Sequence, residues 1–133
     1  MEFTMNVESY NLGKIAAFCE IVERGAKNLG LSDPMPREVY ETIAQAANDI
    51  AIAAHCKWYL EKEFLKTDIV EDSELENKYV ILYYSQDWVI DKYLRLKHRQ
   101  ENLEEENKFT HEEREYQSKE LYKLLSYPTG FSK

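Results

Sequence analysis

The sequence predicts an all-α protein, built as an antiparallel four-helix bundle. Glycine and proline, the residues that interrupt helices, occur only four and three times in 133 residues. Apolar residues also recur three and four positions apart over long stretches, which is the period of one helix face. With 44% hydrophobic residues the chain can bury a core. We expect a single domain over 1–133, with short tails at 1–8 and 127–133.

The first helix is expected over about residues 9–29. The apolar stripe along this segment consists of Leu12, Ile15, Cys19, Val22, Ala26 and Leu29. Gly30 follows, and glycine readily adopts the left-handed backbone that ends many helices. Pro34 and Pro36 then mark the clearest break in the chain, because proline fits the first turn of a helix but not its interior.

Two long helices are expected over about 36–66 and 73–107, joined by a turn near residue 70. Both keep apolar residues at seven-residue spacing, which is typical of packed helices. These residues are Val39, Ile43, Ala46, Ile50, Ala53, Leu60 and Phe64 in the first helix, and Leu75, Tyr79, Leu82, Val89, Tyr93, Leu96 and Leu103 in the second. Ser73 and Glu76 have the spacing of a capping box, which starts a helix. Packed antiparallel, the two helices would form a long hairpin as the scaffold of the bundle.

The last helix is expected over about 111–126. Thr110 and Glu113 repeat the capping-box spacing at its start, and Pro128 ends it. Its apolar residues are Leu121, Leu124 and Leu125.

The tip of this predicted hairpin holds more apolar side chains than two helices can hide from each other. A helix rises about 1.5 Å per residue, so the shorter helices over 9–29 and 111–126 end before they reach it. We therefore expect the tip to form a homodimer or to dock on another protein. Its residues are Trp58, Tyr59, Phe64, Leu65, Ile69, Val70, Leu75, Tyr79 and Val80. The alternative is that the tails cover the tip through Phe3, Met5 and Phe131.

Composition argues against several classes of partner. The net charge of -8 repels a phosphate backbone, so we do not expect nucleic-acid binding, although an acidic surface could mimic a nucleic acid toward a basic protein. No apolar run approaches the roughly 18 residues of a membrane span, and the first ten residues lack the features of a signal peptide. We therefore expect a cytoplasmic protein without membrane contact.

The two cysteines, Cys19 and Cys56, are predicted to be reduced core thiols. If 36–66 is one continuous helix, they lie roughly 15 Å apart along the bundle axis. That separation is too large for a disulfide. We expect no catalytic cysteine, because the neighbouring His55 would point about 100° away from Cys56 around the helix. We also expect no cofactor.

An enzymatic alternative rests on three acidic residues. Asp49, Asp87 and Asp91 would meet across the two long helices, where carboxylates can hold a divalent cation for phosphate chemistry. A metal-dependent phosphohydrolase of an all-α class would result. The paired-glutamate motif of all-α nucleotide pyrophosphatases is absent, however, and the same acids could pair with Lys92 and Arg95 on the surface.

A third alternative is a helical bundle that binds a small molecule. Tyr83, Tyr84 and Trp88 make the middle of the helix expected over 73–107 aromatic on most sides. These rings could line a pocket instead of filling a core.

Overall fold

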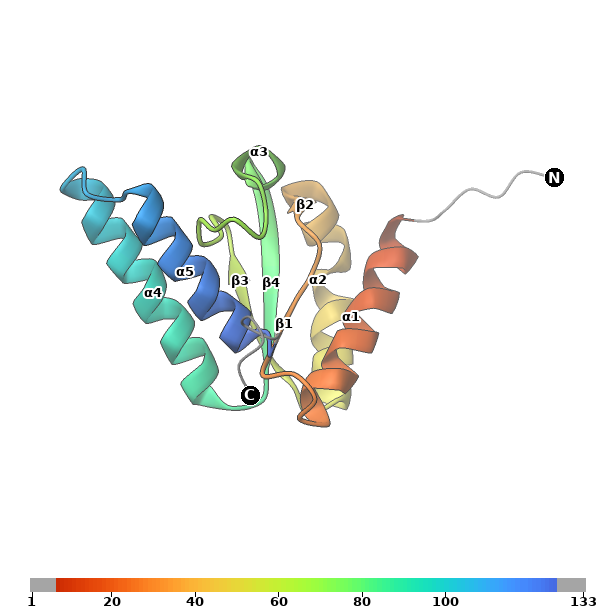
Figure 1. The fold of residues 1–133 in the computed structure, drawn as a ribbon. Helices are drawn as coiled ribbons and strands as arrows, with labels where there is room; N and C mark the ends of the chain where they lie inside the picture. Colours follow the sequence, from red (N-terminus) through yellow and green to blue (C-terminus); the bar gives the residue numbers. More distant parts are fainter. Residues whose placement is uncertain (1–6, 127–133) are drawn as a thin grey trace.

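The computed structural model describes residues 7–126 and has a mixed α/β fold, not the predicted all-α bundle (Figure 1). Helices and short strands follow one another along the described part of the chain. The elements are α1 (Val7–Glu23), β1 (Leu29–Leu31), β2 (Met35–Pro36), α2 (Arg37–Ala53), β3 (Lys57–Glu61), α3 (Asp72–Leu75), β4 (Lys78–Tyr84), α4 (Asp87–Glu105) and α5 (His111–Leu124). The predicted tails lie largely outside this range.

The strands form an antiparallel sheet with β4 at its centre. Along one side of β4 runs β3, paired from Lys57 opposite Tyr84 to Glu61 opposite Val80. The other side of β4 is shared by two short strands, β1 opposite residues 82–84 and β2 opposite residues 78–79. Every strand therefore pairs with β4.

Two helices cover each face of this sheet, α4 and α5 on one side and α1 and α2 on the other (Figure 1). Each face has its own core. The α4/α5 cluster consists of Leu29, Phe64, Leu65, Val80, Leu82, Val89, Ile90, Tyr93, Leu96, Leu121, Leu124 and Leu125. The α1/α2 cluster consists of Ile15, Cys19, Val22, Met35, Ile43, Ala47, Ala51, Cys56, Ile81 and Tyr83.

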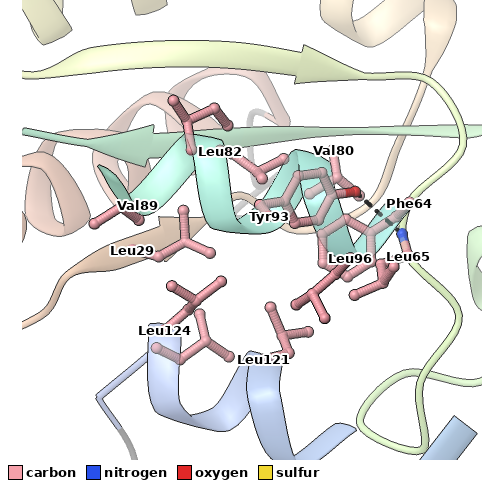
Figure 2. Packing of buried hydrophobic residues seen from close by; sticks show 12 residues of the cluster. Leu29, Phe64, Leu65, Val80, Leu82, Val89, Tyr93, Leu96, Leu121 and Leu124 are labelled. Atoms are coloured by element: carbon pink, nitrogen blue, oxygen red, sulfur yellow. Dashed lines mark hydrogen bonds between the residues drawn. The ribbon is translucent and has the colours of Figure 1, made fainter. Parts of the chain in front are cut away.

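The alternation of side chains along β4 explains why one strand serves both cores. Val80 and Leu82 point to the α4/α5 cluster, whereas Ile81 and Tyr83 point to the α1/α2 cluster. Successive side chains of a strand lie on opposite faces, so a strand covered on both faces is apolar throughout. Figure 2 shows the α4/α5 cluster, in which Tyr93 fills the space between the sheet and α4.

The predicted helix over 36–66 is wrong in its second half because α2 ends at Ala53. His55 takes the left-handed conformation with φ 57°, and the Cys56 N–H turns back to the C=O of Ala51. This is a common helix ending, in which a left-handed residue lets the last carbonyls find donors. Asn107, at φ 55°, follows α4 in the same conformation. Neither position is a glycine, so no strong signal marks these helix ends in the sequence.

The predicted helix over 73–107 is also wrong in its first half, and the hairpin does not exist. Residues 73–75 belong to the short helix α3, residues 78–84 are strand β4, and the long helix covers only Asp87–Glu105. The helix expected over 111–126 is present as His111–Leu124, and the Thr110 hydroxyl accepts the predicted bond from the Glu113 N–H at 3.3 Å. None of the helices in the described range is long and apolar enough to cross a bilayer.

Candidate interaction site at the edge of the sheet

The outer side of β3 is where the main chain of the sheet lacks a partner. The directions in which the main-chain N–H and C=O groups of the two strands point follow from Ile81, at the centre of β4. The Ile81 N–H donates to the Ser32 hydroxyl at 2.9 Å, and the Ile81 C=O accepts from the Ser32 N–H at 2.9 Å. Main-chain groups of successive residues in a strand point to opposite sides. Those of Val80, Leu82 and Tyr84 therefore point toward β3.

The register then decides which residues of β3 face outward. Lys57, Tyr59 and Glu61 lie opposite the three residues of β4 that point toward them, and bond to them. Trp58 and Leu60 direct their N–H and C=O groups away from the sheet. Within the part of the chain that the structure describes, no second strand or other backbone group pairs with these groups. The strand β3 is thus an open edge.

The opposite edge of the sheet is poorly suited to adding a strand. It is divided between β1, with three residues, and β2, with two. Pro36 in β2 has no N–H to donate, and Pro34 lies in the segment between the two strands. With five residues and no proline, β3 is the longer and better template.

The middle of β3 presents aromatic and apolar side chains on both faces. Trp58 and Leu60 pack against the α1/α2 cluster, and Tyr59 packs against the α4/α5 cluster. All three side chains are half-buried, so each keeps some surface for a further contact. The Trp58 indole N–H donates to Asn48 of α2 at 2.8 Å, which fixes this ring. Burial raises the pKa of Tyr59, so its phenol stays protonated.

The two ends of β3 are charged and are held by α4. Lys57 donates to Asp87 at 2.6 Å, a bond that raises the pKa of Lys57. At the other end Glu61, which is 8% exposed, accepts from the Tyr93 hydroxyl at 2.8 Å and from Lys97 at 3.2 Å. Burial, followed by the Glu61 carboxylate, holds the pKa of Tyr93 well above its ordinary value. The strand is therefore fixed at both ends, with a cation at one end and an anion at the other.

Besides Tyr59, five of the nine residues of the predicted hairpin tip belong to the α4/α5 cluster or pack against it. Phe64, Leu65 and Val80 belong to the α4/α5 cluster, against which the half-buried Ile69 and Leu75 also pack. The stacked rings of Phe64 and Tyr93 are 5.7 Å apart. The sheet and the two helices on this face supply the cover that a hairpin would have lacked.

The remaining predicted interface residues are spread over three places. Tyr79 packs on the opposite face, with its ring 5.8 Å from that of Tyr40. Val70 is half-buried in the loop before α3. Only Trp58 and Tyr59 stand on the open edge.

The three acidic residues of the enzymatic alternative are not brought together. Asp49 lies on α2 and accepts from Gln45 at 3.1 Å, whereas Asp87 and Asp91 lie on α4, across the sheet. Asp87 is occupied by Lys57. Among residues 7–126, no group of three or more His, Cys, Asp or Glu side chains is arranged to hold a metal ion.

The aromatic residues of the small-molecule alternative are separated as well. Tyr83 is fully buried in the α1/α2 cluster, and Trp88 is 48% exposed at the start of α4. Tyr84 is half-buried at the end of β4. These three rings do not line one pocket.

A cleft of about 790 Å³ opens beside the end of β3, between the loop that follows it, α3 and α4. Its cations are already engaged within the protein. Lys66 pairs with Glu104, Lys97 pairs with Glu61, and Lys62 lies over an aromatic ring at 5.8 Å. These contacts leave no charge pattern that selects one class of ligand.

Sequence reasoning missed the roles of Lys57, Leu60 and Glu61, because it placed all three in a helix. The available signal was the segment Lys78–Tyr84, whose aromatic and β-branched residues are typical of a buried strand. A buried strand needs neighbours, and residues 57–61 are the nearest upstream run with aromatic residues.

Comparisons with protein-family models, curated proteins and solved structures found no match to this chain.

Proposed function

We propose that this chain is a non-enzymatic protein-interaction protein that forms a homodimer by joining β3 of two copies into one continuous sheet. The observation that carries the proposal is the open edge at Trp58 and Leu60. Strand addition at a sheet edge is a common way for proteins to associate, since main-chain hydrogen bonds supply affinity and side chains supply selectivity. The partner is a second copy because the edge is complementary to itself.

Self-complementarity follows from the positions of the outward-facing groups. In an antiparallel pair, two opposite residues exchange both of their main-chain bonds. When Trp58 of one copy lies opposite Leu60 of the other, every outward N–H and C=O of these residues finds a partner. Tyr59 then lies opposite Tyr59 of the second copy, on a two-fold axis.

The side chains support the same register. Trp58 meets Leu60 on the α1/α2 face, and the two Tyr59 rings meet on the α4/α5 face, as an aromatic pair. Lys57 lies opposite Glu61 of the second copy, so opposite charges face each other at both ends. Shifting the register would leave main-chain groups unpaired and would misalign these charges.

The proposed dimer belongs in a reducing compartment such as the cytoplasm. Cys19 and Cys56 are both free thiols in the structure, and free thiols are typical of proteins kept in the cytoplasm.

Sedimentation velocity over a range of protein concentrations tests the proposal. We expect a monomer–dimer equilibrium for the unaltered chain. Leu60→Pro removes one outward N–H and leaves the bonds to β4 in place, so it should give a monomer that keeps the far-ultraviolet spectrum of the parent. Ile52→Ser is the matched control, because it removes an apolar side chain that is 63% exposed and belongs to α2, not to β3.

Two results would contradict the proposal. The first is an unaltered chain that stays monomeric at the highest concentration. The second is a folded Leu60→Pro variant that dimerises as well as the parent, which would move the interface to another surface.

A further inference from the structure

The two cysteines of the chain lie together in the α1/α2 cluster. Cys19 comes from α1 and is fully buried, and Cys56 lies between α2 and β3 with 7% of its surface exposed. The prediction that they lie roughly 15 Å apart, too far for a disulfide, is wrong. It assumed a helix that continues past Cys56, whereas α2 ends at Ala53 and the chain turns at His55.

The two thiols interact directly but have different environments. Both thiols belong to one buried cluster, and the proximity of Cys56, together with burial, raises the pKa of Cys19. The proximity of Cys19 lowers the pKa of Cys56. The Cys56 sulfur also lies 3.4 Å from the Tyr84 carbonyl oxygen and 3.5 Å from that of Lys57, which fixes its position. Of the two, Cys56 is the thiol that ionises more readily, and thiolates are the reactive form.

The position of Cys56 also makes it the more accessible thiol. Its neighbours in sequence, His55 and Lys57, are both exposed. The left-handed turn at His55 brings the chain to the surface just before Cys56. Cys19 is fully buried in the α1/α2 cluster.

A third polar group completes the site. Tyr83 is fully buried beside both thiols, and its hydroxyl has no hydrogen-bond partner among the described residues. A buried hydroxyl without a partner is costly. Burial raises the pKa of Tyr83, so the group remains an O–H that can donate to a nearby thiolate. The Tyr83 hydroxyl is therefore a hydrogen-bond donor that could stabilise Cys56 when this thiol is ionised.

We propose that Cys19 and Cys56 are a redox modification site, which a peroxide converts into a reversible disulfide within one chain. The Cys56 thiolate attacks one oxygen of hydrogen peroxide and breaks the O–O bond, which gives a sulfenic acid and hydroxide. The Cys19 sulfur then attacks the sulfenic sulfur, and the S–S bond forms as the hydroxyl leaves with the Cys19 proton as water. Hydroxide takes up the proton that Cys56 lost. Two thiols and one peroxide thus give a disulfide and two waters, and a dithiol reverses the change.

Mass spectrometry of the folded protein tests this site. After treatment with hydrogen peroxide, the intact chain should lose the mass of two hydrogen atoms, and a digest without reductant should contain one peptide pair joined through Cys19 and Cys56. Dithiothreitol should restore both the mass and the separate peptides. The oxidised chain should also melt at a higher temperature, because the bond constrains the unfolded chain.

Two variants assign the roles of the thiols. In Cys19→Ser, Cys56 should become a sulfenic acid that dimedone traps, since no second thiol remains. In Cys56→Ser, Cys19 should stay unreacted at the same peroxide concentration. The proposal is overturned if the unaltered folded chain keeps both thiols, if it gives sulfinic acid at Cys56 without the joined peptides, or if the joined peptides form only in denaturant. None of these outcomes depends on whether β3 dimerises.

Discussion

The Tyr93 hydroxyl on α4 donates a hydrogen bond of 2.8 Å to Glu61, the last residue of β3. The same hydroxyl accepts from the Leu65 N–H at 3.2 Å, the bond drawn in Figure 2. One side chain of α4 thereby fixes both the end of the edge strand and the loop that follows it. An edge held in this way loses little conformational freedom when a second strand binds, which favours association.

The pairing of the buried Glu61 with Lys97 should contribute strongly to the free energy of unfolding. Lys97 neutralises it, and the two side chains are only 12% and 11% exposed. Lys97→Met should lower the free energy of unfolding by about 3 kcal/mol, because it leaves a buried carboxylate without its cation. Urea denaturation checks this value. The double variant Lys97→Met/Glu61→Gln should recover most of the loss, and equal destabilisation of the single and double variants would show that the charge is not the cause.

The ion pairs of Glu120 predict a loss of stability in acid. Hydrogen bonds from Lys92 at 2.8 Å and Lys123 at 2.9 Å lower the pKa of Glu120, whose side chain is 12% exposed. Because the pKa of Glu120 is lower in the folded state, its ion pairs contribute their full stability above about pH 4.3, the ordinary pKa of glutamate. This stability is lost as the pH falls through the pKa of Glu120 in the folded protein. We expect Glu120→Gln to be less stable than the parent at pH 7 and equal to it at about pH 2. A stability difference that does not change with pH would contradict this assignment.

The charges at the ends of β3 predict a specific effect on association. Lys57→Glu would place two acids opposite each other at both ends of the proposed dimer. The dissociation constant should rise by roughly tenfold, because each of two symmetric contacts changes by about 0.7 kcal/mol. The stability of the monomer should change little, since the pair of Lys57 with Asp87 is exposed. Sedimentation equilibrium measures the constant.

Arg37→Glu provides the control for this charge reversal. It changes the net charge equally and breaks an exposed pair with Glu41 on α2. If both variants weaken the dimer to the same extent, overall repulsion is responsible and the contact of Lys57 with Glu61 is not made.

Local signals in the sequence predicted the starts of α2 and α5, whereas Gly30, expected to end a helix over 9–29, lies in β1, and α1 ends at Glu23. Thr110 caps α5 as its spacing with Glu113 indicated, and α2 begins directly after Pro36. These features are readable because the side chain that shapes the backbone lies within a few residues of it.

The sheet was missed because its pairing is not local. Leu60, Leu75, Tyr79 and Leu82 happen to stand at spacings that suit a helix, and the break at His55 carries no glycine. The contact of Ser32 with Ile81, which sets the direction of the edge, joins residues far apart in the chain. The open edge of β3 therefore cannot be predicted without the register of the strands. The proximity of Cys19 and Cys56 cannot be predicted without knowing that α2 ends at Ala53.

Disulfide trapping at Tyr59 tests the proposed dimer most directly. Opposite residues outside the hydrogen-bonded pairs of an antiparallel sheet have Cα atoms about 4.5 Å apart, close enough for a symmetric bridge. In a chain that also carries Cys19→Ser and Cys56→Ser, Tyr59→Cys should form a disulfide-linked dimer rapidly. Lys57→Cys, exposed on the same face of the same strand, should not, because it lies opposite Glu61. Trapping of Tyr59→Cys no faster than Lys57→Cys would show that the two copies do not pair through β3 in this register.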